Sequence, residues 1–140
     1  MPRLRQTHEN VELFYMDLDG FKPINDTHGH HVGDAVLAIL GRRLTGCLRK
    51  EDVLVRLGGD EFLALQGHAT GTPDIPQTME RIRRTAGMPI SIDGLMLRIA
   101  ISIGHATWRC ADESVDDALK RADAALYRDK KEAKKPEHSA

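Results

Sequence analysis

Arg56-Leu57-Gly58-Gly59-Asp60-Glu61-Phe62 joins two apolar runs through two glycines and two adjacent carboxylates, and the rest of the chain can be placed around it. A Gly-Gly pair between runs of strand length predicts a tight β-hairpin whose turn needs positive φ. We therefore expect strands over residues 53–57 and 62–65, with the two acids held at a rigid sheet edge. Two carboxylates held at one turn repel each other and raise each other's pKa, unless a cation or a proton compensates.

The composition predicts one globular domain over residues 1–140, because 41% of the 140 residues are hydrophobic and 29% are charged. The net charge of −1 provides no general field for polyanions, so we expect no nucleic-acid partner. Cys47 and Cys110 fit no paired-cysteine metal pattern and indicate small buried thiols in a reducing cytosol. No apolar run approaches the ~20 residues that span a bilayer. We expect a cytoplasmic domain without direct membrane insertion, in a longer parent protein that a separate segment can tether to a membrane.

Hydrophobic periodicity predicts the elements before the central hairpin. Residues 11–16 form a mostly apolar run of strand length that ends at Asp17 and Asp19, and residues 20–32 indicate a loop with a short helix. The next helix is expected to open at Gly33 and Asp34, with an acid in its first turn where the helix dipole favours one. Its apolar positions repeat at helical spacing and face the core: Val36, Leu37, Leu40, Leu44, Cys47 and Leu48.

The second half of the chain predicts two helices and a second hairpin. A helix over residues 77–88 turns Met79 and Ile82 inward, and Asp93-Gly94 predicts a turn between strands 90–92 and 95–103. Along the longer strand, apolar residues alternate with Arg98, Ala100 and Ser102, the period of a strand with one buried face: Leu97, Ile99, Ile101 and Ile103. Ser114 caps a final helix whose inner face carries Ala118, Leu119, Ala122 and Leu126. Helices that alternate with strands and hairpins predict an α+β domain.

Carboxylates end the first strand and follow the glycine pair. If these two strands are neighbours, Asp17 and Asp60 meet at one rim of the sheet. Mg²⁺ takes hard oxygen ligands, usually one or two carboxylates with waters and substrate phosphates, and this pair supplies them. The alternative is that acids simply gather at strand ends, where solvent is close. An EF-hand start is excluded, because Phe21 stands where the fifth loop position needs an oxygen ligand.

Asn25 and Asp34 flank a Gly-His turn and are expected to point into one cleft. A carboxylate accepts well from the N1 and N2 hydrogens of guanine, whereas adenine has no N1 hydrogen, so Asp34 would select guanine. The alternative makes Asn25 a turn residue and Asp34 a helix cap. His28, His30 and His31 lack carboxylate or cysteine ligands at matching spacing, so loop structure is the preferred role for them.

Lysines lie at both ends of the candidate site. Lys22 comes shortly after Asp17, while Lys130 and Lys134 are one helical turn apart and share a face from which both can reach a triphosphate. A lysine at a helix C-terminus also needs no ligand, because it complements the helix dipole.

Taken together, these segments resemble the GGDEF-domain diguanylate cyclases, named for the run that stands here as Gly58-Gly59-Asp60-Glu61-Phe62. The residues from Asp17 to Asp26, then Gly29-His30 and Gly33-Asp34, match the family's first block in order and spacing. Its later blocks are matched by Ser102-Ile103-Gly104, Ala122-Asp123 and Ala125-Leu126-Tyr127. The resemblance implies a palm-like fold of the ferredoxin-like, nucleotidyl cyclase type, with a central antiparallel sheet flanked by helices.

The resemblance also implies the reaction, in which two GTP molecules condense into cyclic di-GMP and release pyrophosphate. Mg²⁺, with Mn²⁺ as the alternative, would be held by Asp17, the Leu18 carbonyl and Asp60, and Glu61 would act as the base or as a second metal support. Guanine would contact Asn25 and Asp34 and pack on Leu37. Phosphates would contact Lys22, Lys130, Lys134 and the amides near Phe21, with His30 counted in the same substrate-binding set. Gly58 and Gly59 would leave room for the triphosphate to approach the backbone.

Two further expectations concern assembly and regulation. One GTP per domain requires two domains face to face, so catalysis is expected from a homodimer whose parent protein adds a sensor or dimerising domain. Arg49 and Asp52 have the spacing of the family's Arg-x-x-Asp product-inhibition site. The resemblance implies that this pair binds cyclic di-GMP, because Arg can pair bidentately with guanine. The alternative is a helix-end Arg beside a turn Asp.

The chain departs from the family pattern at both ends. The usual first helix with its Leu-Thr and Asn-Arg signature is absent, and Ala133-Lys134-Lys135 replaces the usual Gly-Arg-Asn without a closing strand. Lys134 keeps the charge of the Arg but loses its bidentate fork. The alternative function is therefore a non-catalytic module that binds GTP or cyclic di-GMP and controls a partner domain.

Overall fold

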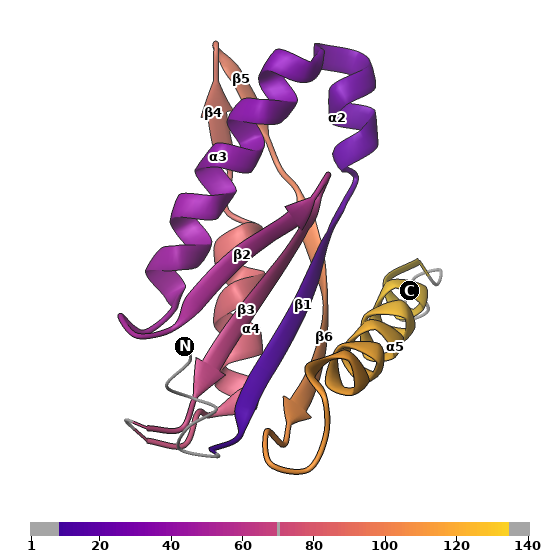
Figure 1. The fold of residues 1–140 in the computed structure, drawn as a ribbon. Coiled ribbons are helices and arrows are strands. Elements are labelled where there is room, and N and C mark those ends of the chain that lie inside the picture. Colours follow the sequence, from indigo (N-terminus) through magenta and orange to yellow (C-terminus); the bar gives the residue numbers. More distant parts are fainter. Residues whose placement is uncertain (1–8, 70, 135–140) are drawn as a thin grey trace, which may run out of the picture.

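The computed structural model describes residues 9–69 and 71–134, with side chains up to residue 132 (Figure 1). The described elements, in chain order, are β1 (Val11–Asp19), α2 (Phe21–His28), α3 (His30–Cys47), β2 (Val53–Gly58), β3 (Glu61–Gly67), α4 (Ile75–Ala86), β4 (Ile90–Ile92), β5 (Leu95–Leu97), β6 (Ala100–Trp108) and α5 (Val115–Lys134). Within the described residues, no helix combines the length and the apolar character needed to cross a membrane.

A four-stranded antiparallel sheet in the order β2-β3-β1-β6 forms the centre of the molecule. Side chains alternate across β1, so Phe14, Met16 and Leu18 enter the main core with residues of α2, α3 and α4. Val11 and Leu13 face the other way and form a smaller cluster with Ala118 of α5. The predicted α+β fold with a central antiparallel sheet flanked by helices is confirmed.

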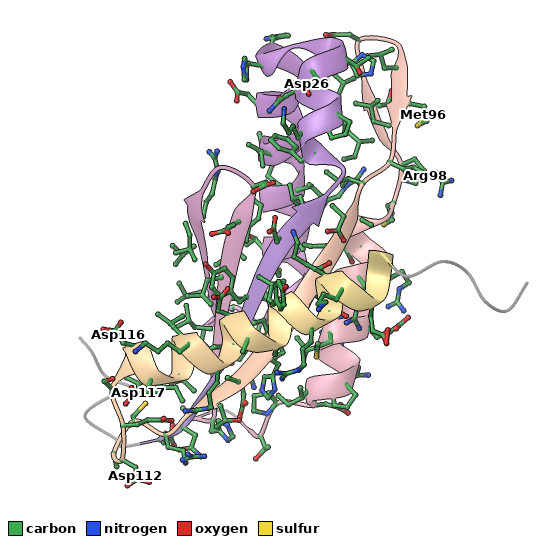
Figure 2. The ribbon with its side chains drawn as sticks, turned by 90° about the vertical axis from the view of Figure 1, so that its right-hand side faces the viewer. Asp26, Met96, Arg98, Asp112, Asp116 and Asp117 are labelled. Carbon is green, nitrogen blue, oxygen red and sulfur yellow. The ribbon has the colours of Figure 1, made fainter. Side chains whose placement is uncertain are left out.

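Helix α5 lies directly against β6, and Gly104 makes this approach possible (Figure 2). A Cβ added at Gly104 would overlap the carbonyl oxygen of Ala122 and the amide nitrogen of Leu126, and would lie 2.7 Å from the Leu126 Cα. The helix begins as predicted, since the Ser114 hydroxyl accepts a hydrogen bond from the Asp117 amide at 3.2 Å. The backbone of α5 therefore rests on the sheet at a fixed position.

A buried carboxylate lies at the end of the sheet where β1 begins. Glu12 is 5% exposed and accepts hydrogen bonds from His105, Thr107 and His68, each at 2.7 Å. Burial alone would raise the pKa of Glu12, but the bonds from these three residues lower it to about 2. The cluster stabilises the ionised carboxylate on the face of the sheet that α4 covers.

The start of α3 differs from the prediction. Gly29, at φ 89°, lies between α2 and α3, and its carbonyl accepts the Gly33 amide at 3.1 Å, so α3 begins at His30. Its first turn consequently contains no acid, and Asp34 lies one turn inside the helix. The short helix predicted within residues 20–32 is α2, but the expected loop is reduced to Gly20 and Gly29, because α3 begins directly after Gly29.

The predicted strand over 95–103 is two strands. Arg98 and Ile99 belong to no ladder: β5 pairs only with β4 in a separate two-stranded sheet, whereas β6 pairs with β1. Asp93 (φ 51°) and Gly94 (φ 80°) form the predicted turn. Ser102 was expected on the solvent face but is 1% exposed, because α5 covers that face of β6.

Helix α4 also begins and ends earlier than predicted. The Asp74 side chain caps it by accepting the Gln77 amide at 3.1 Å, and the helix ends at Ala86. Ile82 is buried as expected, whereas Met79 is only half-buried.

The two cysteines are free thiols, with Cys47 buried and Cys110 half-buried.

Candidate functional site

The central hairpin forms as predicted and carries the acidic pair to the rim of the sheet. Gly58 (φ 144°) and Gly59 (φ 48°) supply the positive φ values, and Arg56 donates to the Gly59 carbonyl through Nε at 3.2 Å and Nη2 at 2.9 Å. The strands β1 and β3 are neighbours, and the Leu18 amide donates to the Asp60 carbonyl at 3.1 Å. Asp60 is therefore held beside the end of β1 by main-chain contacts.

Negative charge is concentrated at this rim. Burial raises the pKa of Asp60, and the neighbouring Asp17 carboxylate raises it further, while Lys130 opposes the effect. The ammonium group of Lys130 donates to Asp17 Oδ2 at 2.8 Å, whereas Asp17 Oδ1 is buried without a hydrogen-bond partner. A buried carboxylate oxygen without a donor favours a cation.

The oxygen donors at this rim fit a hard divalent cation. Asp17 and Asp60 contribute carboxylates, and Leu18 lines the same pocket of about 320 Å³ as Asp60 and Lys130. In the described part of the chain, no group of three or more His, Cys, Asp or Glu side chains could hold a metal ion. Two carboxylates with a carbonyl leave coordination positions for waters and phosphates, which suits Mg²⁺.

Three polar residues at the rim were absent from the predicted site. Asp19 accepts from Ser102 Oγ at 2.7 Å and lies 3.9 Å from the ammonium group of Lys130. Tyr15 donates its hydroxyl to Glu61 Oε1 at 3.1 Å. Burial and the hydrogen bond to Glu61 together raise the pKa of Tyr15 to about 12. The sequence could have indicated Tyr15 and Asp19, because each lies two residues from Asp17 in β1 and so shares its face of the strand.

Asn25 of α2 packs against Gly33 of α3, and a separate pocket lies between α3 and the central hairpin. Asn25 Oδ1 is buried without a partner, and a Cβ at Gly33 would overlap it and lie 2.9 Å from Asn25 Cγ. The missing side chain at Gly33 therefore sets the position of the Asn25 amide. Asp34 and Leu37 line a pocket of about 750 Å³ against the central hairpin. The pocket therefore offers an exposed carboxylate and an apolar floor, while Asn25 Oδ1 lies buried beside α3 without a hydrogen-bond partner.

The other predicted site residues differ in their burial and in their contacts. Phe21 is buried and lines the Asp60 pocket with Lys22, whose exposed ammonium group donates to Asp26 at 3.1 Å. Figure 2 places Asp26 at the end of the molecule opposite Asp112. His30 is exposed at the start of α3. Lys134 ends α5, and its side chain lies outside the described residues.

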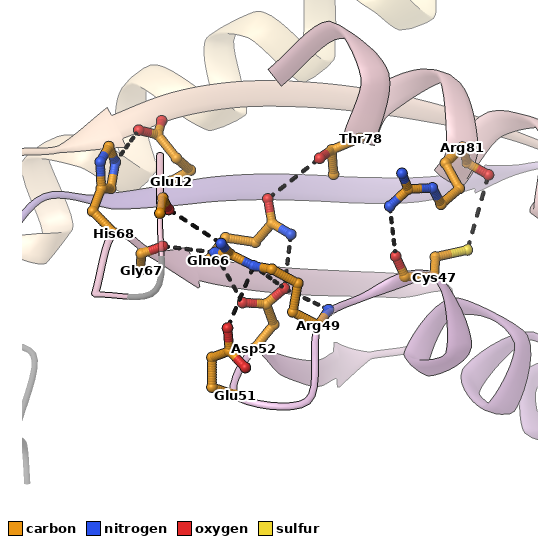
Figure 3. A network of polar contacts seen from close by, with 11 residues as sticks. Glu12, Cys47, Arg49, Glu51, Asp52, Gln66, Gly67, His68, Thr78 and Arg81 are labelled. Carbon is orange, nitrogen blue, oxygen red and sulfur yellow. Dashed lines mark hydrogen bonds and ion pairs between the residues drawn. The ribbon is translucent and has the colours of Figure 1, made fainter. Parts of the chain in front are cut away.

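Arg49 and Asp52 form a network of polar contacts (Figure 3), in which Asp52 Oδ1 is buried without a hydrogen-bond partner. The Asp52 side chain is 0% exposed, and its Oδ2 accepts from the Arg49 amide at 2.7 Å, from Arg49 Nε at 3.3 Å and from Gln66 Nε2 at 2.7 Å. Arg49 also donates to the carbonyls of Gly67 at 2.7 Å and Gly71 at 3.1 Å. The pair thus joins the segment before β2 to the end of β3.

Comparisons with known proteins agree with this architecture. A family model described as "Diguanylate cyclase, GGDEF domain" matches residues 1–136. The diguanylate cyclase DgcM of Escherichia coli K12 is 40% identical over 127 residues, which are 90% of this chain and 30% of DgcM. The bifunctional diguanylate cyclase/cyclic di-GMP phosphodiesterase MucR of Pseudomonas aeruginosa is 36% identical over 115 residues, 82% of this chain and 17% of MucR.

A solved structure shows the same fold. The diguanylate cyclase SiaD of Pseudomonas aeruginosa, in complex with its activator SiaC, superposes with a TM-score of 0.82 at 33% identity, over 93% of this chain and 52% of that chain. The chain spans less than a third of the length of the two curated relatives. On the family model, the sequence relatives and the shared fold, the chain belongs to the diguanylate cyclase GGDEF-domain family.

Proposed function

We propose that this chain is a Mg²⁺-dependent diguanylate cyclase domain that condenses two GTP molecules into cyclic di-GMP and pyrophosphate. The observation that carries the proposal is the buried, unpartnered Asp17 oxygen beside Asp60, together with the unpartnered Asn25 amide oxygen on α2, the helix that follows β1. One group calls for a cation and the other for a hydrogen-bond donor. A purine nucleotide with its metal supplies both.

The base would be read by Asn25 and Asp34. The Asp34 carboxylate accepts from N1 and N2 of guanine, and Asn25 Oδ1 gains the donor that it lacks in the structure. Leu37 would pack on the ring. Adenine would leave the carboxylate unpaired, so the same contacts discriminate against ATP.

The reacting phosphates would lie at the rim. Asp17, the Leu18 carbonyl and Asp60 would hold Mg²⁺, which when bound would offset charge on the α-phosphate and favour deprotonation of the attacking 3′-hydroxyl. Lys130 and Lys22 would contact phosphate oxygens, and Gly58 and Gly59 would leave space for the triphosphate beside the backbone. Glu61, oriented by the Tyr15 hydroxyl, would be the base or a further metal support.

Catalysis needs two such sites face to face, because each domain would bind one GTP and the two must be brought into line. We therefore propose a homodimer as the active form and a further sensor or dimerising domain in the parent protein. Product inhibition through Arg49 and Asp52 belongs to the same proposal. Since Arg49 holds the Gly67 and Gly71 carbonyls, product binding there requires Arg49 to leave them.

A non-catalytic nucleotide-binding module is the second candidate, and the ion pair between Lys130 and Asp17 favours it, because the site is partly neutralised without a metal. Incubation of concentrated protein with GTP and Mg²⁺, followed by nucleotide analysis, separates the two. The cyclase predicts cyclic di-GMP that disappears in Asp60→Ala and persists in the surface control Asp112→Ala. Absence of product even after forced dimerisation, with tight binding of GTP or cyclic di-GMP, would select the binding module.

A further inference from the structure

Asp129 lies beside Lys130 on α5 and makes two contacts that the proposed chemistry does not use. Its Oδ2 accepts the backbone amide of Ile103 at 2.8 Å. Both of its carboxylate oxygens lie 3.4 Å from Nη2 of Arg83. The carboxylate therefore touches β6 and α4 while belonging to α5.

The contact with Ile103 fixes α5 at the sheet edge. Strand β6 is an edge strand that pairs with β1, and the Ile103 amide is turned to the helix instead of to a neighbouring strand. A carboxylate that accepts a backbone N–H forms a charge-assisted hydrogen bond, which is stronger and more directional than a neutral one. Asp129 thus satisfies an edge amide and fixes the rotation of α5 about its own axis.

The contact with Arg83 links the two layers of helices. Helix α4 packs with α3 in the main core, whereas α5 covers the other face of the sheet. The Arg83 guanidinium reaches around β6 to the Asp129 carboxylate. The last turns of α5 are therefore held from β6 and from α4, one turn beyond the close approach at Gly104.

The position of this double contact relates it to the reacting rim. Ile103 pairs with Met16, and its neighbour Ser102 pairs with Asp17. Lys130 follows Asp129 directly and reaches Asp17 Oδ2 at 2.8 Å. A rotation of α5 about its axis by one residue, about 100°, would carry the ammonium group away from the carboxylates.

We propose that Asp129 is a positioning residue for Lys130. Its hydrogen bonds to the Ile103 amide and to the Arg83 guanidinium orient the last turns of α5. In this orientation the Lys130 ammonium group lies beside Asp17 and can contact the phosphates of a bound nucleoside triphosphate. The inference rests on the proposed function for the triphosphate, and on the structure alone for the orientation of Lys130.

The test compares Asp129→Ala, Asp129→Asn and Arg83→Ala with the control Asp117→Ala, which removes an exposed carboxylate from the far end of α5 (Figure 2). The first readout is the rate at which an amine-reactive reagent modifies Lys130 relative to the exposed Lys120, measured by mass spectrometry without substrate. We expect the relative rate to rise about threefold or more in Asp129→Ala, less in Asp129→Asn and Arg83→Ala, and not at all in the control. Asn rescues in part because its amide oxygen still accepts the Ile103 amide.

The second readout is the affinity for Mg²⁺–GTP and, where product forms, kcat and KM. We expect Asp129→Ala to weaken GTP binding about fivefold to tenfold and to have no further effect once Lys130→Met is present. Unchanged Lys130 reactivity and GTP affinity in a folded Asp129→Ala protein would overturn the inference. If Asp129→Ala does not fold, unchanged Lys130 reactivity and GTP affinity in both Asp129→Asn and Arg83→Ala would overturn the inference. If Lys130 reactivity rises in Asp129→Ala but the wild-type protein binds no GTP, the proposed function alone is refuted and the positioning role stands.

Discussion

Replacement of Gly33 by alanine offers a test of guanine recognition in which no polar residue is substituted. The added Cβ would overlap Asn25 Oδ1 and lie 2.9 Å from Asn25 Cγ and 3.3 Å from Phe21 Cζ. The end of a side chain can rotate away at little cost, so we expect the Asn25 amide to leave its present position while the fold persists. Alanine also has a higher helix propensity than glycine by up to about 1 kcal/mol, which offsets the crowding.

The expected loss is that of one hydrogen bond to the base. A neutral hydrogen bond contributes about 0.5–1.5 kcal/mol, so the Kd for Mg²⁺–GTP should rise about 2- to 12-fold, measured by isothermal titration calorimetry. Asn25→Ala should have a similar effect, and the double variant should lose no more than either single one. Gly46→Ala is the matched control in the same helix, because nothing lies within 4 Å of its added Cβ. If Gly33→Ala and Asn25→Ala bind GTP as tightly as the wild type, Asn25 does not contact the base.

Three further predictions concern stability. Gly104→Ala should lower the free energy of unfolding by about 1–3 kcal/mol in urea titrations, because α5 must move off β6, and an unchanged midpoint would contradict the close packing described above. Since the folded-state pKa of Glu12 is about 2, below its ordinary value of 4.5, its stabilisation is present above pH 4.5 and is lost as the pH falls towards 2. This loss should approach about 3 kcal/mol and should be absent in Glu12→Gln, as measured by unfolding at a series of pH values. Asp52→Ala should cost about 1–3 kcal/mol, because it removes the buried carboxylate that accepts from Arg49 and Gln66, and retention of full stability would show that the pair is not structural.

The sequence was sufficient for elements whose signal is local. The central hairpin was predictable because its glycine pair lies between two apolar runs, and α5 was predictable because Ser114 precedes a regular apolar spacing. The start of α3 was not, because Gly29 ends one helix and begins another, and the pattern around it fits a loop equally well. The break between β5 and β6 was also hidden, because the alternation of side chains runs unbroken through Arg98 and Ile99 while the pairing partner changes.

The candidate site also contains contacts that the sequence could predict and contacts that depend on tertiary packing. The approach of Asp17 to Asp60 followed from two strands becoming neighbours. The contact between Lys130 and Asp17 joins residues 113 positions apart, so no spacing rule indicates it. The spacing of Lys130 and Lys134 and the resemblance to a family predicted only that Lys130 contacts phosphates. Ser102 and Asp129 were not predicted, because their partners depend on where α5 lies on the sheet.

The contacts of Lys130 have a consequence for the electrical balance of the rim. Its ammonium group lies among Asp17, Asp19 and Asp60. With all three ionised, these carboxylates and the ammonium group leave two negative charges, and Glu61 at the same rim adds a third, so one divalent cation cancels most of the charge. A nucleoside triphosphate that arrives without a counter-ion would restore the excess negative charge, so electroneutrality favours a substrate that brings its own cation. Under the proposed function, the site would therefore favour the magnesium complex of the nucleotide over the free polyanion.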